Sequence, residues 1–316
     1  MRQAVLNEPR RFSVAEVPVP AVGPGEVLLR VAACGVCASE LDIYRGAAGH
    51  ASYPWHPGHE VSGVVERVGA GVAGPAPGDP VAVWVTAGGY GQYVAVPAGH
   101  CFPAGDVPLE LAALGEPLAC AVNAVELAGV RLGDDVVIVG AGFMGQLIQR
   151  LVQLRGPRRV IVADTRDDAL ARAAAAGATA TVNPATDDLA GAVRDLTDGA
   201  GADVTVEITG TQGALEAIGG CTRMSGTLVI AGYHQGPPRQ LPLADWNWNA
   251  FRIANAHFRD VATILGGLRA GMRLVTSGRI SLDGLVTHRF PLATIDEAFR
   301  TAIDKPEGFV KATVTP

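Results

Sequence analysis

The stretch Asp135-Val-Val-Ile-Val-Gly-Ala-Gly-Phe-Met-Gly145 decides the fold of this chain. An apolar run typical of a buried strand leads into three spaced glycines, and a helical pattern follows them. Such glycines permit a tight turn, a close backbone approach to a pyrophosphate, and close packing of helix on strand. The stretch therefore predicts a dinucleotide site at the helix N-terminus, where phosphate charge is favoured. A glycine-rich turn without a ligand is the alternative. The predicted cofactor contacts are Gly140, Gly142, Phe143, Met144 and Gly145.

Apolar strands alternate with helical segments from about residue 124 to about residue 260. Such alternation predicts an α/β architecture with a doubly wound parallel sheet, a Rossmann domain spanning 124–260. The expected segments after the first strand are a strand at Arg159–Ala163, a helix near 167–176, and strands near 203–208 and 226–231.

Asp164 ends the second strand of this domain, where an acidic side chain usually accepts hydrogen bonds from the adenosine ribose hydroxyls. A 2′-phosphate there would meet like charge at short range, so Asp164 predicts NAD rather than NADP. Arg166 follows two residues later and would suit a 2′-phosphate if it swung over it. Its alternative role is to face solvent at the start of the next helix, so NADP stays open as a second cofactor.

The flanking segments have a different character from the central domain. Residues 1–123 are rich in Val, Gly and Pro, with short strand-like runs such as Glu26–Val31 and Val61–Val68 separated by turn signals. Such a pattern predicts an irregular β-rich unit. The tail 261–316 ends in a strand near Gly308–Val314, which we expect to return and complete the first domain.

Composition limits the class of function. The chain has 316 residues, 48% of them hydrophobic, and a net charge of −6, which gives no basic surface for nucleic acid. No apolar stretch reaches the roughly 18 residues of a transmembrane helix, and the N-terminus lacks the apolar core of a signal peptide. Five cysteines make no disulfide framework at this length, so a cytoplasmic location is expected.

Four residues upstream of the glycine motif offer metal-ligand chemistry. Cys37, His59, Glu60 and Glu116 supply a thiolate, an imidazole and two carboxylates, which together can hold zinc and leave a position for substrate. Each has an ordinary alternative, because a lone histidine is more often a core residue and a lone glutamate a solvated charge. The pair Cys34 and Cys37 also has the spacing of a redox pair or half a zinc ribbon. Spacing alone leaves the metal open.

Several motifs resemble the zinc-containing medium-chain dehydrogenases, the alcohol and polyol dehydrogenase superfamily. The resemblance follows the whole chain in order and is nearest to the sorbitol and polyol branch. It implies a GroES-like catalytic domain, 1–123 with 261–316, joined to the Rossmann domain. The segments that carry it are Gly58-His-Glu-Val-Ser-Gly-Val-Val-Glu-Arg-Val-Gly69, Cys34-Gly-Val-Cys-Ala-Ser-Glu-Leu-Asp42, Gly78-Asp-Pro-Val81, Gly115-Glu-Pro-Leu118 and Gly308-Phe-Val-Lys311.

The resemblance assigns metal ligands residue by residue. Cys37 and His59 match two ligands of the catalytic zinc. Glu60 matches an adjacent glutamate that is a ligand in some members and a near neighbour in others. Glu116 matches the third-ligand position, a glutamate in polyol dehydrogenases that binds zinc directly or through water.

Other positions match parts of the catalytic apparatus. Ser39 matches the hydroxyl that receives the substrate proton, and Asp42 stands where some members place a relay histidine. Glu40 replaces the usual aspartate that orients the zinc-bound histidine, a departure that can alter ligand geometry. Lys311 resembles a basic residue near the cofactor phosphates. Residues between the ligand segments are candidates to line the substrate site, with surface-loop positions as the alternative: Tyr44, His50, Tyr53, Trp55 and His56.

One family feature is missing. Many members carry a lobe of four cysteines that binds a structural zinc, but the corresponding region Val83–Val94 contains no cysteine. We therefore expect one catalytic zinc per subunit. Cys101, Cys120 and Cys221 are then interpreted as small core residues.

These features predict a zinc-dependent oxidoreductase that transfers hydride between NAD(H) and a secondary alcohol or ketone, such as a polyol, sugar or cyclitol. The alternatives are an NAD(P)H-dependent reductase of a C=N or activated C=C bond in a specialised biosynthetic pathway, and a catalytically silent cofactor-binding protein. The apolar strand around Phe251–Ala256 should lie at the edge of the Rossmann sheet, where pairing with a second copy would give a homodimer.

Overall fold

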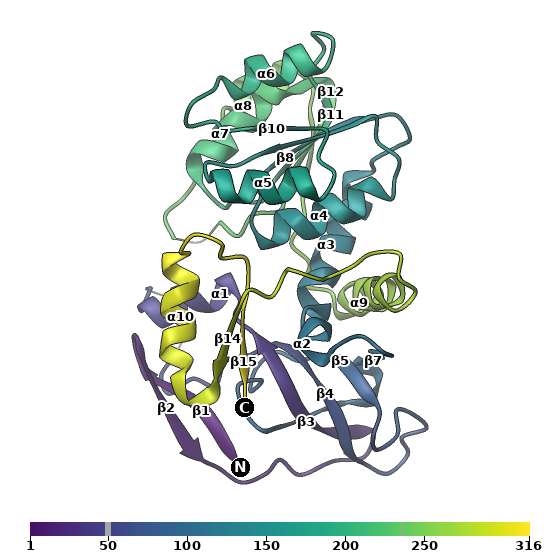
Figure 1. Cartoon of the computed structure of the whole chain (residues 1–316), viewed down its shortest axis with the longest axis vertical. Coiled ribbons are helices and arrows are strands. Elements are labelled where there is room, and N and C mark those ends of the chain that lie inside the picture. The colour runs from purple at the N-terminus through teal and green to yellow at the C-terminus, as the bar shows by residue number, and fades with distance from the viewer. Residues whose placement is uncertain (48–51, 235) are drawn as a thin grey trace. The chain divides into compact units, whose positions relative to one another are not determined.

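A computed structural model of the chain describes residues 1–47, 52–234 and 236–316. The chain divides into two compact units (Figure 1). Unit 1 comprises Met1–Ala119 with Val261–Pro316, and unit 2 comprises Cys120–Asp260. Helix α3 (Gly115–Ala128) belongs to unit 1 through its first turn and to unit 2 beyond it. None of the helices in the described ranges combines the length and apolarity needed to cross a bilayer.

Unit 1 is built on a seven-stranded sheet in the order β14-β15-β3-β4-β5-β7, with β6 pairing with β3. A separate hairpin joins β1 (Arg2–Glu8) and β2 (Arg11–Glu16). The sheet strands are β3 (Glu26–Gly35), β4 (Glu60–Val68), β5 (Pro80–Trp84), β6 (Tyr93–Pro97), β7 (Cys101–Pro103), β14 (His288–Pro291) and β15 (Ala312–Thr315). The helices are α1 (Ala38–Arg45), α2 (Leu109–Ala112), α9 (Val261–Thr276) and α10 (Ile295–Asp304), with 3-10 turns at Ala98–His100 and Leu292–Thr294.

The C-terminal tail completes this sheet, as the sequence predicts. Strand β15 runs antiparallel to β3, with Val314 opposite Cys34 and Thr313 opposite Gly35. On its other side β3 pairs with β4, where Gly35 lies opposite Glu60. The register therefore brings the end of the chain, the Cys34–Cys37 segment and the start of β4 to one edge of the sheet.

An aromatic cluster forms much of the core of unit 1. Phe299 of α10 packs against Phe12, Tyr44 and Tyr90, with ring centroids 4.9 to 5.7 Å apart. All four side chains are buried, Tyr90 completely. Large rings in such tilted arrangements bury much apolar area and fix the position of α10 on the sheet.

Unit 2 is a six-stranded parallel sheet in the order β10-β9-β8-β11-β12-β13. The predicted doubly wound α/β architecture is confirmed. The chain leaves β8 for β9 and β10 on one side and then crosses to β11 on the other, so the strand order reverses beside β8. Its strands are β8 (Asp135–Val139), β9 (Arg159–Ala163), β10 (Ala180–Val182), β11 (Ala202–Glu207), β12 (Thr222–Ile230) and β13 (Arg252–Asn255). Its helices after α3 are α4 (Phe143–Gln153), α5 (Asp167–Ala175), α6 (Leu189–Leu196), α7 (Gln212–Cys221) and α8 (Leu243–Trp248).

The strand predicted for the edge of this sheet lies there. β13 pairs with β12 on one side, and it is the last strand in the order. Ile253 on β13 is 44% exposed and Trp248 at the end of α8 is 81% exposed. The edge therefore presents both open backbone and apolar side chains.

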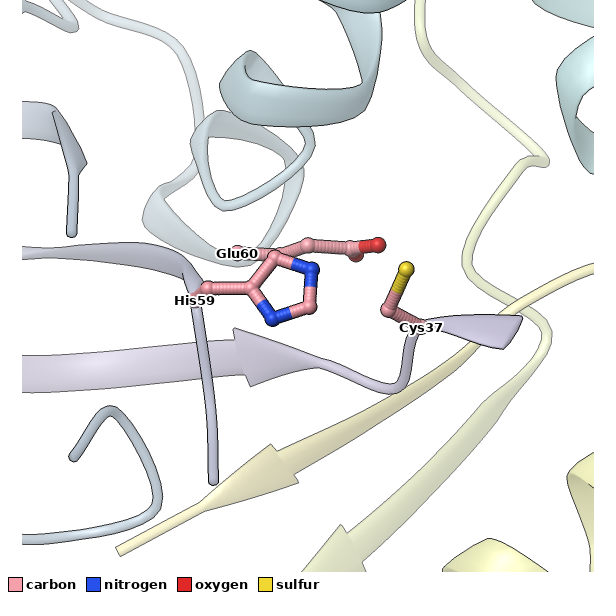
Figure 2. A group of neighbouring side chains, drawn as sticks. All are labelled: Cys37, His59 and Glu60. Carbon is pink, nitrogen blue, oxygen red and sulfur yellow. The ribbon is translucent and has the colours of Figure 1, made fainter. Parts of the chain in front are cut away.

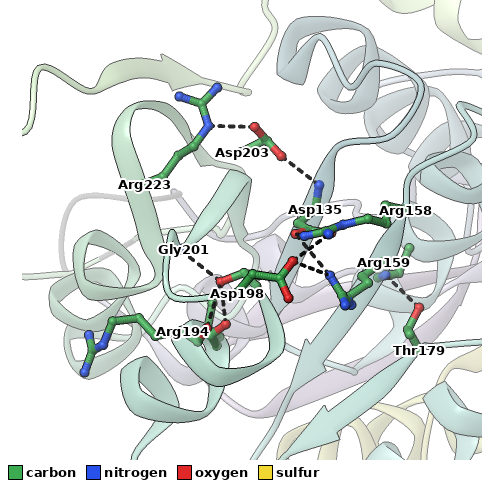
Figure 3. A network of polar contacts seen from close by, with 12 residues as sticks. Asp135, Arg158, Arg159, Thr179, Arg194, Asp198, Gly201, Asp203 and Arg223 are labelled. Atoms are coloured by element: carbon green, nitrogen blue, oxygen red, sulfur yellow. Dashed lines mark hydrogen bonds and ion pairs between the residues drawn. The ribbon is translucent and has the colours of Figure 1, made fainter.

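An ion-pair network lies at the amino ends of the central strands (Figure 3). Arg158 pairs with buried Asp135 and, at 2.7 Å, with Asp198. Asp203 accepts the backbone N–H of Asp135 at 2.8 Å and pairs with Arg223 at 2.6 Å. The network lies at the opposite end of the sheet from the glycine motif, so it supports the fold and not the cofactor site.

Candidate metal centre and dinucleotide site

Three of the four predicted metal ligands come together in unit 1. Cys37, His59 and Glu60 each place one potential ligand atom within 4.8 Å of the others (Figure 2). Cys37 precedes α1 as its N-cap, and Glu60 begins β4 directly after His59. The Gly35–Glu60 register of β3 and β4 brings these distant segments together, and Gly58 turns the chain with φ of +105°.

Glu60 provides the test of whether a cation fits here. Its side chain is buried, and Lys311 Nζ donates to Oε1 at 2.7 Å. No donor in the described part of the chain reaches Oε2, which is also buried. A Cβ at Gly35 would lie 2.0 Å from that oxygen, so only glycine leaves room for it. A buried carboxylate oxygen without a partner is costly, and a metal ion beside sulfur and nitrogen ligands would satisfy it.

Lys311 has a different place from the one that the resemblance implies. Its side chain is only 6% exposed and its charge is committed to Glu60, whereas the expectation put it near the cofactor phosphates. Burial acts to lower the pKa of Lys311, but Glu60, Cys37 and Glu116 outweigh it and raise that pKa. Lys311 is therefore a buried cation beside the candidate metal centre.

His59 is held by Glu40, the glutamate that replaces the usual aspartate. Glu40 Oε1 lies 3.0 Å from His59 Nδ1 and accepts the backbone N–H of Gly58 at 2.7 Å. A bond from Nδ1 fixes the imidazole tautomer and leaves the other ring nitrogen as the metal ligand. Figure 2 shows one ring nitrogen on the side of Glu60 and Cys37. Glu40, although one methylene longer than aspartate, therefore still makes the contact that orients the His59 ring.

The charges of this group shift the pKa values of its members. Burial acts to lower the pKa of His59, but the neighbouring Cys37 and Glu40 raise it well above its ordinary value. Burial likewise acts to raise the pKa of Glu40, whereas His59, Tyr90 and the Gly58 N–H lower it. Cys34 behaves differently, because burial and the nearby carboxylates raise its pKa, so it is an inert thiol.

Ser39 lies beside the candidate metal centre. Its hydroxyl donates to Cys37 Sγ at 3.2 Å from the first turn of α1. Asp42 lies one turn further along α1, where Arg45 pairs with it at 3.4 Å. Any outward proton path through Asp42 therefore includes an ion-paired carboxylate.

Glu116 lies apart from the three-residue group. It stands in the first turn of α3, half-buried, and outside the set of ligand atoms within 4.8 Å. Its charge still reaches the centre, because Glu116 raises the pKa of Lys311.

The aromatic residues between the ligand segments have structural contacts. The prediction that Tyr44 lines the substrate site is wrong, since it is 2% exposed in the aromatic core and its hydroxyl donates to Asp296 at 3.2 Å. Tyr53 donates to the Ile43 carbonyl at 2.6 Å, and Trp55 pairs with Leu6 through backbone bonds. His50 lies outside the described residues.

The dinucleotide motif of unit 2 has the geometry that its glycines predict. Gly140 has φ of +118°, a conformation that other residues rarely adopt. A Cβ at Gly145 would lie 1.8 Å from the Gly140 carbonyl oxygen, so only glycine allows the turn to pack this closely. Gly142 is the N-cap of α4, with Phe143 and Met144 in its first turn. The motif therefore opens α4 beside the strand where the sheet order reverses, the position at which such folds bind dinucleotides.

Asp164 is fixed at the end of β9. One carboxylate oxygen accepts the N–H of Ala141 at 2.8 Å, and the other accepts the N–H of Arg166 at 2.9 Å. Arg166 is the N-cap of α5, and its Nε lies 3.6 Å from Asp164. Asp164 is thus hydrogen-bonded to the glycine turn through Ala141, and Arg166 contacts Asp164.

Comparisons with known proteins match both units. The family described as "Alcohol dehydrogenase GroES-like domain" matches residues 23–108, and "Zinc-binding dehydrogenase" matches residues 144–270. The sorbitol dehydrogenase of Gallus gallus is 33% identical over 325 residues, covering 90% of this chain and 88% of its own. The chain belongs to the zinc-binding dehydrogenase family. The predicted family and the predicted class of enzyme are confirmed.

Two further proteins place this dehydrogenase among enzymes of alcohols. The erythritol/L-threitol dehydrogenase of Mycolicibacterium smegmatis (strain ATCC 700084 / mc(2)155) is 30% identical, covering 100% of this chain and 98% of its own. The crystal structure of 2R,3R-butanediol dehydrogenase from Bacillus subtilis superposes with a TM-score of 0.88 at 25% identity, covering 100% and 99% of the two chains.

The dehydrogenase also contains a buried acidic residue that sequence reasoning missed. Glu207 ends β11 with no exposure, accepts the backbone N–H groups of Thr209 and Gly210 at 2.6 and 2.8 Å, and contacts His234 Nε2 at 2.7 Å. It shapes the loop at the carboxyl end of β11, on the far side of β8 from Asp164. The available signal was an acid at the end of an apolar strand, followed by Ile-Thr-Gly.

Proposed function

We propose that this dehydrogenase transfers hydride between NAD(H) and a secondary alcohol or ketone of a polyol, sugar or cyclitol, at one zinc ion per subunit. Cys37, His59 and Glu60 would hold the ion, with Glu116 as a further ligand directly or through water. The observation that carries the proposal is the buried, unpartnered Glu60 Oε2 beside a thiol and an oriented imidazole. The names of the polyol-active relatives support the substrate class.

The chain's own residues supply orientation and proton handling. Zinc bound by this ligand set would act as a Lewis acid that lowers the pKa of a bound alcohol. Glu40 holds the His59 ring, and Lys311 holds the Glu60 carboxylate, so neither ligand needs to reorganise. Ser39 Oγ, 3.2 Å from Cys37 Sγ, is close enough to the centre to take the substrate proton. Asp42, paired with Arg45, is the next carboxylate outward on the same helix.

NAD is the proposed cofactor, with NADP second. Gly140, Gly142 and Gly145 would receive the pyrophosphate, and α4 would face it with its N-terminus. Asp164 has a side chain only 13% exposed and is held by two backbone N–H groups, so its charge would repel a 2′-phosphate. Arg166 is paired with Asp164. This pairing favours a role in which Arg166 stabilises the Asp164 carboxylate and does not bind a 2′-phosphate.

A homodimer is the proposed assembly. The open edge of β13, with Ile253 and the nearby Trp248 exposed, suits strand pairing with a second copy around a two-fold axis. All five cysteines are free thiols, which suits a reducing compartment such as the cytoplasm.

Two measurements test the proposal. Metal analysis of the purified protein should find one zinc per subunit, and Cys37→Ala should lose both zinc and turnover while its circular dichroism stays unchanged. A panel of polyols, sugars and cyclitols, followed at 340 nm with both nicotinamide cofactors, should give turnover. Activity confined to imines or enones would instead favour the reductase alternative, and two tightly bound zinc ions per subunit would contradict the single-site assignment.

A further inference from the structure

We propose that Tyr90 is a positioning residue for the metal centre, whose hydroxyl holds Glu40 and through it the ring of His59. The inference rests on the proposed zinc site and adds a residue that neither the ligand set nor the sequence motifs include. Tyr90 comes from the segment between β5 and β6, the region that lacks the four-cysteine lobe of other members.

The geometry of Tyr90 is that of a buried tether. The side chain is completely buried, and its hydroxyl lies 2.7 Å from Glu40 Oε2 and 2.9 Å from the Gly35 carbonyl oxygen. The hydroxyl has a single proton, and the charged carboxylate is the stronger acceptor. Tyr90 therefore donates to Glu40 from a position that the surrounding core fixes.

The two oxygens of Glu40 depend on different donors. Oε1 interacts with the Gly58 N–H and with His59 Nδ1. Oε2 accepts the Tyr90 hydroxyl at 2.7 Å and has only a long contact of 3.5 Å with the Cys37 N–H. The terminal torsion of a glutamate has broad preferences, so a carboxylate held on one side can rotate. Losing the Tyr90 hydroxyl would leave Oε2 buried with its weak contact alone, and the His59 ring would lose a fixed partner.

The backbone of the same segment also supports the ligand loop. Gly89 N donates to the Gly58 carbonyl at 2.9 Å, next to His59. A Cβ at Gly89 would lie 2.4 Å from Val61 Cγ2 and 2.8 Å from the Gly58 carbonyl oxygen, so only glycine permits this approach. The segment thus contacts the His59 loop through the backbone N–H groups of Gly88 and Gly89 and through the Tyr90 side chain by way of Glu40.

Tyr44 provides a matched control in the same unit. It is also a buried tyrosine packed on Phe299, and its hydroxyl donates to a carboxylate, Asp296, at 3.2 Å. Asp296 is outside the metal group. Tyr90→Phe and Tyr44→Phe therefore remove the same atom from a core tyrosine that is bonded to a carboxylate, although the Tyr44–Asp296 bond is only partly buried. Only the first variant removes it from the chain of contacts that ends at His59.

The test is the zinc dissociation constant of the full chain, measured by competition with a chromophoric chelator after metal removal. Tyr90→Phe should weaken zinc binding several-fold, less than the roughly ten- to a hundred-fold usual for losing a direct partner of a metal ligand, here Glu40. Tyr44→Phe should leave the zinc dissociation constant at the wild-type value, even where thermal stability falls similarly. Equal zinc affinity in Tyr90→Phe and wild type, or equal losses in both variants, would overturn the proposal.

Two further measurements separate the possible failures. In the Glu40→Gln background, Tyr90→Phe should weaken zinc binding by less than it does alone, because both residues act through His59. Strictly additive losses of zinc-binding free energy in the two single variants and the double variant would count against the inference. The zinc-loaded wild-type crystal structure must keep the Tyr90–Glu40 hydrogen bond, a requirement that holds even if Tyr90→Phe does not fold. Wild-type protein that binds no zinc would defeat the proposed function itself, whereas zinc-binding wild type with an unaffected Tyr90→Phe would defeat this inference alone.

Discussion

Lys311→Met tests the interpretation of the buried charges at the metal centre. The substitution keeps an unbranched apolar side chain and removes the ammonium group that lies 2.7 Å from Glu60 Oε1. The pair is buried on both sides, with side-chain exposures of 6% and 1%. Removing one partner of such a pair leaves an uncompensated charge, which costs about 3–5 kcal/mol of folding free energy. For a unit of this size, the loss corresponds to a fall in melting temperature of roughly 6–20 °C.

Zinc should reduce this loss. Glu60 Oε2 has no donor among the described residues, so a divalent cation would compensate the carboxylate that Lys311→Met leaves unpaired. Melting should therefore be followed by circular dichroism in chelator and in saturating zinc. The destabilisation should be large in chelator and clearly smaller in zinc, so that zinc stabilises the variant more than it stabilises the wild type.

Lys305→Met is the control, because Lys305 is the other lysine of the chain and lies on an exposed surface. It should change the melting temperature little in either condition. Equal losses for Lys311→Met with and without zinc would refute the interpretation that Glu60 faces a cation. A loss no larger than that of Lys305→Met would refute the buried ion pair itself.

Three further outcomes follow from the described contacts. Asp164→Ala should reduce the preference for NAD over NADP by about tenfold, the effect of losing one charged hydrogen bond, and kcat/KM with both cofactors measures it; a wild type that is more efficient with NADP would make Arg166 the deciding residue. Burial acts to raise the pKa of Asp203, but the Asp135 N–H and Arg223 outweigh it and lower that pKa. The contribution of Asp203 to folding stability is therefore present above its unfolded-state pKa and is lost as the pH falls through the lowered folded-state pKa. Acid unfolding should consequently be less steep in Asp203→Asn than in wild type, and identical pH profiles would exclude this contribution. Ile253→Glu should convert the proposed dimer to a monomer by light scattering, and a dimer unaffected by that charge would place the interface elsewhere.

Local pattern was enough to predict the architecture of unit 2. The glycines at 140 and 145 are required by a positive φ and by a contact that excludes a Cβ, both of which depend on residues a few positions away. The strand Asp135–Val139 is buried at every position, as its continuous apolar run predicts for the centre of a parallel sheet. The edge position of β13 was likewise predictable, because β13 is the last strand of a doubly wound sheet that grows outward from β8.

The candidate metal centre was only partly predictable, because its outer contacts join residues far apart in sequence. The Lys311–Glu60 pair spans 251 positions and exists because β15 lies against β3, which in turn pairs with β4. A basic residue near the chain end gave no sign of that pairing. The resemblance supplied candidate ligands but assigned Lys311 to phosphates, since a motif carries residue types and not the partners that tertiary packing provides.

Glu40 illustrates why the outer contacts matter for this chain in particular. Its extra methylene, compared with aspartate, lets the carboxylate reach the Tyr90 hydroxyl at 2.7 Å while still meeting His59 at 3.0 Å. The longer side chain has more torsional freedom to lose on ordering, and the four donors around it hold it in one orientation. Glu40 in place of the family's aspartate is therefore accommodated by Tyr90, a buried tyrosine fifty positions away in the sequence. The orientation of His59 depends on the fold of the whole unit and not on the ligand motif alone.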